Sequence, residues 1–427
     1  MSRLVIKNGR VIDPSQNLNA NSDVAIEDGV VREIAPEIDA SASEQFDASG
    51  FIVAPGFIDM HVHFREPGFE HSETIESGSR AAAAGGFTSV ACMPNTQPVN
   101  DSATVTSYIK DRAQRFAIVN VYPIGAITKD SAGQELAAIA SMKRAGIVAI
   151  SDDGMPVMNA RLVRRAMEYA KAIDIPLIEH CEDLHLSSGG DMHEGVQSTR
   201  LGLRGIPRSS EDVMVARDLI VAELTGTRYH VAHISSKHAV EMVGAAKSRG
   251  LPITCEATPH HFALVDTDMR PYDSNYKMKP PLREPADADA VAQGLVNGTI
   301  DAIATDHAPH PGDEKMQEFE RCPFGIIGLE TALPLALEKL YHSGRVTLAK
   351  LIRMFTCNPA GILSLNCGTL RVGSPGDVTI FGLDHKWTYN VNRSPSRSRN
   401  TPFHGRAFRG GPIATIVSGR AVWPFET

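Results

Sequence analysis

Residues 57–65 read Phe57-Ile58-Asp59-Met60-His61-Val62-His63-Phe64-Arg65, an apolar run that ends in two imidazoles and a guanidinium at alternate positions. In an extended strand, residues two apart point to the same side, so His61, His63 and Arg65 can converge on one point. Imidazole is the commonest metal ligand, and a guanidinium binds a carboxylate bidentately. Two histidines at this spacing are as readily explained as ordinary polar residues of a strand, so the stretch alone leaves metal binding open.

Similar apolar runs recur along the middle of the chain and alternate with longer helical patterns, such as residues 70–84, 160–173, 236–249 and 329–342. The runs are residues 57–61, 87–92, 118–124, 147–151, 176–180, 229–233, 252–256 and 301–305. Eight strand and helix alternations over roughly 300 residues predict an α/β fold of the (β/α)8 TIM-barrel type, with its active site at the C-terminal ends of the strands. We assign this barrel to residues 56–364.

The two ends of the chain have a different pattern. Residues 4–47 and 368–423 contain short alternating strands separated by turn signals such as Asn8-Gly9 and Asp28-Gly29. Neither end has enough strands for a stable sheet of its own. We therefore expect a small β-sandwich-like domain, with a structural role, that is assembled from residues 1–55 and 365–427. Its strands should include residues 378–381 and 413–417.

Composition limits the class of protein. The chain has 427 residues, of which 42% are hydrophobic, and a formal net charge of −8, so we expect no nucleic acid partner. No apolar run reaches the roughly 18 residues that a membrane span needs, and residues 1–12 lack the pattern of a signal peptide. We expect a cytoplasmic protein with no membrane partner. The six scattered cysteines contain no Cys-x-x-Cys, which argues against both a disulfide framework and a thiolate zinc site.

Side chains that can bind metal fall at the ends of the predicted strands. They are His61, His63, Asp152, Asp153, His180, His233 and Asp306. Each one alone can be explained as a hydrogen-bonded polar residue at a strand end, but a random scatter would rarely place all of them there. Four imidazoles and two carboxylates, counting only one of the adjacent Asp152 and Asp153, suit Zn, Mn or Co and are too many for one tetrahedral zinc. The pattern favours two metals that share one carboxylate, from either Asp152 or Asp153.

The loop after the last predicted strand carries a second motif, Thr305-Asp306-His307-Ala308-Pro309-His310. Asp306 can contact one metal and also take a proton from a metal-bound water, so we predict that it is the general base and acid. His310 should reach the rim of the pocket and contact the ligand. His260 and His261, which follow the seventh run, are of a suitable type, but the ligand set is complete without them.

These motifs resemble the amidohydrolase superfamily and, within it, class I dihydroorotase. Residues 59–67 match the first signature of that family, and residues 304–310, continuing to Lys315, match the second. Shorter matches in family order extend the resemblance over nearly the whole chain. They lie at residues 93–96, 151–154, 179–181, 232–235 and 323–325.

The resemblance implies two Zn²⁺ ions per subunit and a set of substrate contacts. His61, His63 and Asp306 would hold one zinc, His180 and His233 the other, and Asp153 would bridge them. Arg65, Asn95 and His310 would bind the carboxylate of the substrate, and backbone at Phe324 and Gly325 would contact its ring. His63 is also counted among the substrate contacts.

Two positions bear on substrate choice. Lys279 occupies a place where members of the family carry an asparagine that contacts substrate. A lysine can approach a carboxylate as a point charge but lacks the planar amide, so we keep Lys279 as a substrate contact. Residues 146–151 contain no lysine, whereas hydantoinase-type and allantoinase-type enzymes bridge their metals with a carboxylated lysine at this strand. The resemblance therefore favours an aspartate bridge and dihydroorotase.

The implied reaction is the reversible hydrolysis of (S)-dihydroorotate to N-carbamoyl-L-aspartate in de novo pyrimidine (UMP) biosynthesis, by a hydroxide activated by two zinc ions. Two alternatives remain. One is another cyclic amidohydrolase of the hydantoinase, dihydropyrimidinase or allantoinase type. The other is a non-catalytic, dihydroorotase-like scaffold partner of aspartate carbamoyltransferase, which the complete ligand set disfavours. We expect a homo-oligomer and leave an association with aspartate carbamoyltransferase open. Residues 184–208 read as an insertion whose many turn residues suggest mobility.

Overall fold

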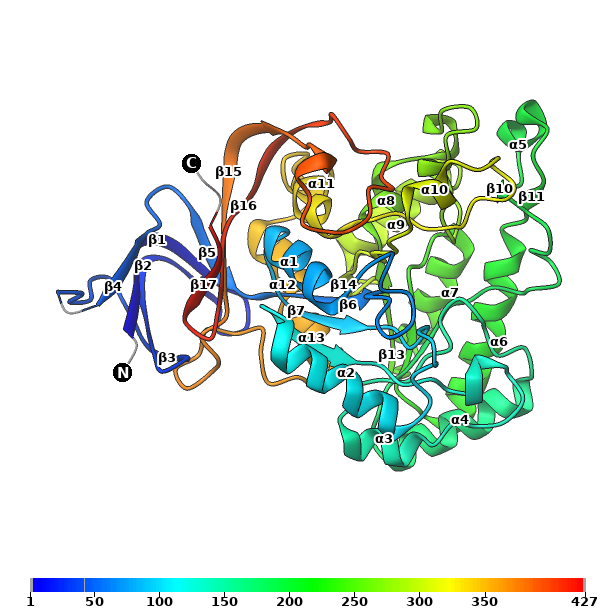
Figure 1. Ribbon diagram of the computed structural model, residues 1–427, viewed down its shortest axis with the longest axis horizontal. Coiled ribbons are helices and arrows are strands. Elements are labelled where there is room, and N and C mark those ends of the chain that lie inside the picture. The colour runs from blue at the N-terminus through cyan, green and yellow to red at the C-terminus, as the bar shows by residue number, and fades with distance from the viewer. Residues whose placement is uncertain (1–2, 42, 425–427) are drawn as a thin grey trace.

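The computed structural model describes residues 3–41 and 43–424 and has an α/β fold. Figure 1 shows a β-sheet on the left, built from the blue and red ends of the chain, beside a larger body of helices and strands from the middle of the chain. The two ends of the chain therefore meet in one structure, and the middle forms the other.

The sheet made from both ends has the strand order β17-β16-β15-β5-β1-β2-β3, with β4 paired to β1. Its strands are β1 (Arg3–Asp13), β2 (Leu18–Glu27), β3 (Val30–Ala35), β4 (Glu44–Asp47), β5 (Ile52–Pro55), β15 (Val378–Thr388), β16 (Ala407–Val417) and β17 (Arg420–Pro424). The ends join where β15 runs antiparallel to β5, with Ile380 opposite Val53. Both side chains are buried with Ile6 and Ile416 in one apolar cluster. Since all these strands are hydrogen-bonded into one sheet, the expected sandwich of two sheets is not confirmed.

Seven of the eight predicted runs form parallel strands within the described residues. The strands are β6 (Phe57–Val62), β7 (Phe87–Cys92) and β8 (Asn120–Pro123) in one sheet, and β9 (Leu177–Glu179), β12 (Tyr229–Val231), β13 (Ile253–Ala257) and β14 (Ala302–Ile303) in another. The segment 147–151, which the structure describes in full, forms no strand. It lies between a helix that ends at Ala145 and a turn in which Met155 N donates to Asp152 O, and Ile150 is the one residue of the segment that makes ladder bridges.

Isolated bridges connect the two parallel sheets. Ile150 bridges to Gly125 on one side and to Leu177 on the other, and Val62 bridges to His307 at the opposite junction. The described residues nevertheless form no closed sheet. The strands are buried on both faces: Leu177 packs toward the helices, and its neighbour Ile178 packs in a separate inner cluster.

Helices surround these strands. The longer helices are α1 (Ile75–Ala84), α2 (Ala103–Phe116), α3 (Ile139–Ala145), α4 (Ala160–Ala172), α6 (Ser209–Thr225), α7 (Lys237–Ser248), α9 (Pro285–Asn297), α12 (Leu348–Phe355) and α13 (Cys357–Leu363). The shorter elements are α5 (Val196–Leu201), α8 (Pro259–Ala263), α10 (Gly312–Lys315), α11 (Ala332–Ala336), a π-helix at Leu337–Tyr341, and the two-residue strands β10 (Met192–His193) and β11 (Gly205–Ile206). Short 3-10 helices lie at Lys129–Ser131, Asp266–Asp268, Ser274–Tyr276, Leu329–Thr331 and Val391–Arg393.

Two predicted helices differ from the structure in ways that the chain explains. α1 begins at Ile75 and not at residue 70, because Thr74 caps it by accepting a hydrogen bond from Ser77 N. The predicted helix at 329–342 is split into a 3-10 turn, α11 and a π-turn. Pro334 lies inside this segment and has no N–H to donate, which interrupts the regular ladder.

Candidate metal centre and active site

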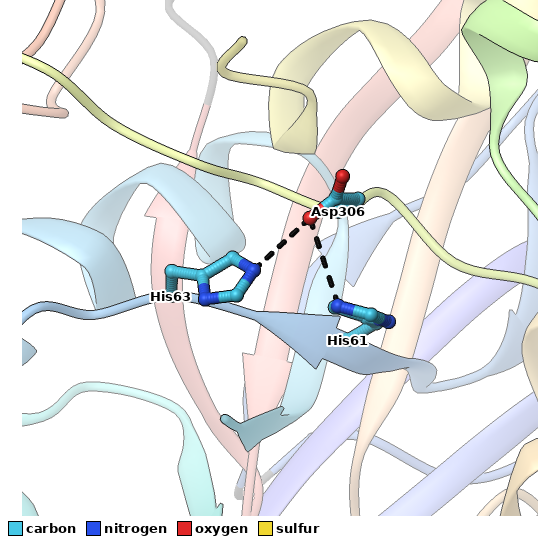
Figure 2. A group of neighbouring side chains, drawn as sticks. All are labelled: His61, His63 and Asp306. Carbon is cyan, nitrogen blue, oxygen red and sulfur yellow. Dashed lines mark hydrogen bonds and ion pairs between the residues drawn. The ribbon is translucent and has the colours of Figure 1, made fainter. Parts of the chain in front are cut away.

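Three side chains, carried by the first and the last of the parallel strands, meet at one point. His61 and His63 come from the end of β6, and Asp306 follows β14 (Figure 2). Asp306 Oδ1 lies 3.0 Å from His63 Nε2 and 3.6 Å from His61 Nε2. All three side chains are buried, and their ligand atoms lie within 4.8 Å of one another. This spacing allows all three to bind one ion.

Asp153 lies at the centre of the four imidazoles. Its Oδ1 is 3.4 Å from His61 Nε2, 3.6 Å from His233 Nε2 and 3.8 Å from His180 Nδ1, and its Oδ2 is 3.5 Å from His63 Nε2. This carboxylate can therefore face two ions at once.

Asp152 is turned the other way. Its Oδ1 accepts hydrogen bonds from the backbone N–H groups of Ile127 and Thr128, at 2.8 and 3.1 Å. The two adjacent aspartates, which residue type alone left equivalent, thus have different surroundings. Asp152 supports the turn after Ile150, and Asp153 faces the histidines.

Three of the imidazoles are held from behind by oxygen atoms. His61 Nδ1 lies 2.7 Å from Glu256 Oε1, His63 Nδ1 lies 2.8 Å from Asn95 Oδ1, and His180 Nε2 lies 3.0 Å from Glu182 Oε2. An oxygen acceptor at the outer nitrogen can hold the proton there, which would free the inner nitrogen to bind a metal ion.

Glu182 and Glu256 were missed by the sequence analysis. Glu182 comes two residues after His180, and Glu256 lies within the seventh apolar run, where a buried acid is unusual and could have been noticed.

The donor set fits a divalent metal. Among the described residues, His61 Nε2 and Asp153 Oδ1 are buried atoms without a hydrogen bond partner, and both point into the cluster. Buried polar atoms are rarely left unpaired, and nitrogen and oxygen donors of this kind suit a borderline cation. Burial opposes the charge of Asp153, yet the neighbouring imidazoles of His61 and His233 hold its pKa well below the ordinary value. Asp153 is therefore ionised.

Three residues of the site have backbone in the left-handed region, which is uncommon for residues other than glycine. The φ angles are 56° at Arg65, 29° at His233 and 49° at Asp306. Such conformations cost on the order of 1 to 3 kcal/mol each and persist where the surrounding structure holds them. In this chain they occur just after strands, where they turn the three side chains toward the cluster.

The predicted carboxylate-binding residues lie beside the predicted metal ligands. Arg65 Nε donates to Pro309 O at 3.3 Å, and its Nη2 lies 3.4 Å from His310 Nε2. Burial, together with the charge of Arg65, lowers the pKa of His310 to about 3, so His310 is neutral near pH 7. Asn95 uses its Oδ1 on His63, which leaves its amide nitrogen for another partner.

Gly325, which follows Phe324, packs against the loop that carries Ala308 and His310. Gly325 has φ 126°, and a Cβ there would come within 2.7 Å of Ala308 Cβ and 3.3 Å of His310 Nε2. Only glycine permits this close approach.

Lys279 lies between Glu182 and the Phe324 ring. Its Nζ lies 2.8 Å from Glu182 Oε1 and 4.8 Å from the centroid of the Phe324 ring. The structure thus pairs Lys279 with the acid that holds His180.

His260 and His261 belong to neither candidate ion-binding group in the described part of this site. His261 is engaged with Thr258 Oγ1 at 2.7 Å and Pro280 O at 2.8 Å.

Within residues 3–41 and 43–424, the helices lack the combination of length and apolarity that crossing a bilayer requires.

Comparisons with known proteins agree on one family. A family model described as dihydro-orotase-like matches residues 50–239. The dihydroorotase of Solibacter usitatus (strain Ellin6076) is 68% identical over 420 residues, which cover 98% of this chain and 98% of the relative. The dihydroorotase of Geobacter sp. (strain M21) is 53% identical over 421 residues, covering 98% of this chain and 99% of the relative.

Solved structures with a similar fold include the L-hydantoinase (dihydropyrimidinase) from Arthrobacter aurescens, with a TM-score of 0.90 and 26% identity over 99% of this chain and 96% of that one. The dihydropyrimidinase from Brevibacillus agri NCHU1002 has a TM-score of 0.84 and 22% identity, covering 99% and 95% of the two chains. The fold is thus shared with hydantoinases, whereas the much higher sequence identity is with dihydroorotases. The protein belongs to the dihydroorotase family of cyclic amidohydrolases.

Proposed function

We propose that this dihydroorotase is of class I and works with two Zn²⁺ ions held around Asp153. The reaction is the reversible hydrolysis of (S)-dihydroorotate to N-carbamoyl-L-aspartate, a step of UMP synthesis. The observation that carries the proposal is the position of the Asp153 carboxylate, whose oxygens lie 3.4 to 3.8 Å from a nitrogen of each of the four imidazoles. An aspartate in this position takes the place of the carboxylated lysine expected in hydantoinase-type enzymes.

Two groups of ligands share Asp153 in this proposal. His61, His63 and Asp306 would hold one ion, and His180 and His233 the other. A divalent metal here supplies Lewis acidity, which polarises a ring carbonyl and makes water a nucleophile near neutral pH. The unpaired His61 Nε2 and Asp153 Oδ1 support a cation between them.

Asp306 is proposed as the group that moves the proton. Burial opposes its charge, but the hydrogen bond from His63 and the neighbouring His61 hold its pKa well below the ordinary value, so the resting carboxylate is ionised. It can accept a proton from the attacking water and return it to the ring nitrogen as the amide bond breaks. One carboxylate thereby serves as base and then as acid.

Arg65, Asn95 and His310 are proposed to bind the carboxylate of the substrate. The Arg65 guanidinium is a bidentate donor, Asn95 has its amide nitrogen free of His63, and neutral His310 lies 3.4 Å from Arg65. His63, whose Nδ1 is fixed by Asn95, would border both the ion and the substrate.

Phe324 and Gly325 would contact the ring of the substrate through their backbone. Lys279 stays a proposed substrate contact, and it would have to share its charge with Glu182, from which it is 2.8 Å away.

We also propose that the two parallel sheets and segment 147–151 form one (β/α)8 barrel over residues 56–364. The bridges of Ile150 with Gly125 and Leu177, and of Val62 with His307, support this arrangement because they lie at both junctions between the sheets. Residues 1–55 and 365–427 would form the second domain. A cytoplasmic location, a homo-oligomer and an association with aspartate carbamoyltransferase remain predictions.

Steady-state kinetics on a panel of cyclic amides tests the substrate proposal. The zinc-loaded enzyme should turn over dihydroorotate with a kcat/KM about 100-fold or more above that for hydantoin, dihydrouracil or allantoin, because only dihydroorotate has a carboxylate for Arg65. Equal or better turnover of the uncharged rings would favour the hydantoinase-type alternative. A fully metal-loaded protein without turnover of any ring would favour the scaffold alternative.

A further inference from the structure

Two lysines are buried at the rim of the site, although the proposed reaction uses neither. The exposed fraction is 2% for Lys277 and 6% for Lys315. Lysine is rarely buried to this extent unless its ammonium group is fully paired, because removing the charge from water is costly. Lys315 is also the last residue of the second signature motif, although it has no role in the proposed hydrolysis. Its burial must therefore be explained by the groups that its ammonium contacts.

The ammonium group of Lys315 donates to three backbone carbonyls. Its Nζ lies 2.9 Å from Pro323 O, 3.1 Å from Gly325 O and 3.4 Å from Lys277 O. An ammonium group has three N–H donors, so one side chain satisfies all three oxygens. Two of these oxygens flank Phe324 in the segment that is proposed to contact the substrate ring.

The ammonium group of Lys277 holds the preceding part of the same segment. Its Nζ donates to Phe319 O at 2.6 Å and Glu320 O at 3.2 Å, and lies 4.5 Å from the centroid of the Phe324 ring. Such a cation over an aromatic face is attracted by the ring quadrupole. Lys277 therefore contacts both the backbone and the aromatic side chain of this segment.

Lys277 also reaches the insertion at residues 184–208. Its Nζ lies 3.3 Å from Oδ1 of Asp191, a buried acid just before β10. In Figure 1 the insertion, with α5, β10 and β11, lies at the far right of the molecule, beyond α10. The ion pair thus joins a distant insertion to the rim of the site.

The peptide groups of Gly325 are held on both sides. Gly325 N donates to Lys277 O at 2.9 Å, and Gly325 O also accepts from Asn400 Nδ2 at 3.0 Å in addition to Lys315. With φ at 126° and Ala308 against its α carbon, this glycine has little freedom to move. Its position is set by residues that are distant in the sequence.

We propose that Lys277 and Lys315 are positioning residues that hold the backbone of Phe324 and Gly325 where the substrate ring binds, and that Lys277 couples the insertion to this backbone through Asp191. The inference rests on the proposed function, because ring contact at Phe324 and Gly325 is part of it. A methionine of similar length would leave the carbonyls of Pro323 and Gly325 buried without this donor. The backbone between them would then lose its fixed position.

Lys315→Met and Lys277→Met test the proposal with two readouts. The KM for dihydroorotate should rise about 10-fold or more while kcat changes less than about threefold, and metal content should stay at the wild-type level. Hydrogen exchange at residues 319–326 should become faster, including at the Gly325 amide. Lys315→Arg and Lys277→Arg, which keep a cation, should restore part of the wild-type KM.

Lys247→Met is the matched control. Lys247 on α7 also donates to a backbone carbonyl and a carboxylate, Thr299 O at 2.8 Å and Asp301 Oδ2 at 2.6 Å, but at another place in the fold. Its loss should leave KM and exchange at residues 319–326 unchanged. If both rim variants keep the wild-type KM and exchange rates, or if Lys247→Met changes them equally, the positioning role is wrong.

Asp191→Asn keeps the proposal testable if the lysine variants fold poorly. It removes the charge partner of Lys277, so the ammonium group should be held less firmly against Phe319 O and Glu320 O, and exchange at residues 319–320 should become faster. Unchanged exchange at residues 319–320 would refute the coupling. Hydrogen exchange needs no substrate, so a wild-type enzyme that fails to hydrolyse dihydroorotate would contradict the proposed function without affecting this result.

Discussion

Glu182 accepts a hydrogen bond from His180, with 3.0 Å between Oε2 and the imidazole Nε2. The other oxygen of Glu182 lies 2.8 Å from the ammonium nitrogen of Lys279. Burial opposes the charge of Glu182, but His180 and Lys279 hold its pKa well below the ordinary value. An ionised acid therefore fixes the imidazole with its Nδ1 turned toward His233 Nε2, at 2.9 Å, and Asp153 Oδ1, at 3.8 Å.

Glu182→Gln should weaken metal binding at the His180 side of the centre. The amide oxygen still accepts a hydrogen bond, but the negative charge that orients and polarises His180 is gone, and a loss of about 10- to 100-fold in metal affinity is expected. Competition with a chromogenic chelator measures it. Glu168→Gln, which removes an exposed ion pair with Arg164, is the control. Unchanged affinity in Glu182→Gln would show that His180 needs no such support.

Asp306→Asn should retain metal and lose most turnover. The amide keeps a ligand oxygen but cannot accept a proton, and a fall in kcat of about 10² to 10⁴ is expected. Metal content and kcat are measured on the same preparation. Asp313→Asn, on an exposed position of α10, should behave as wild type. Normal turnover by Asp306→Asn would remove Asp306 from the proton-transfer role.

Arg65→Lys should impair substrate binding although the charge is kept. A lysine lacks the planar pair of donors, so the KM for dihydroorotate should rise about 10- to 100-fold. Turnover of dihydrouracil, which has no carboxylate, should change little and serves as the internal control. An equal loss with both substrates would mean that Arg65 acts on something other than the carboxylate.

The fold and the centre could be predicted to different depths. The period of two in β6 brings His61 and His63 to one side of the strand, and β7 spans the predicted residues 87–92, all of which are buried. Segment 147–151 is also apolar, but strand formation there depends on neighbours that only the fold supplies. Val148, Ala149 and Ser151 make single backbone hydrogen bonds to residues 123–125, and only Ile150 forms bridges.

Choices between like residues were beyond the sequence. Asp152 and Asp153 are adjacent and chemically identical, and they are separated by the backbone N–H groups of Ile127 and Thr128, which bind Asp152. Glu182 and Glu256 were missed because their roles depend on contacts with imidazoles across the strand ends.

Glu330 gives a prediction on stability and pH away from the centre. Its carboxylate accepts hydrogen bonds from Ser394 and, at 3.4 Å, from Tyr389, and burial raises its pKa to about 7. Between the ordinary value and pH 7 the folded state holds more protons than the unfolded state, so stability from this group is present at low pH and is lost as pH rises through 7.

Glu330→Gln removes this loss. The variant should have a higher Tm than wild type at pH 8, on the order of 2 kcal/mol in stability, and almost no advantage at pH 5. Calorimetry at the two pH values measures the difference. Glu338→Gln, which removes an ion pair with Arg406 at 2.8 Å, should give no gain at pH 8. A gain for Glu330→Gln that is equal at both pH values would contradict the assignment.

The central claim is that two ions share Asp153, and metal titration of the chelator-treated enzyme tests it most directly. Zinc bound per chain and turnover of dihydroorotate are followed together, for wild type and for Asp153→Asn. We predict that wild-type activity rises until two zinc ions are bound per chain and that Asp153→Asn fails to hold two. Full activity with one zinc ion or none, or wild-type stoichiometry and turnover in Asp153→Asn, would contradict it.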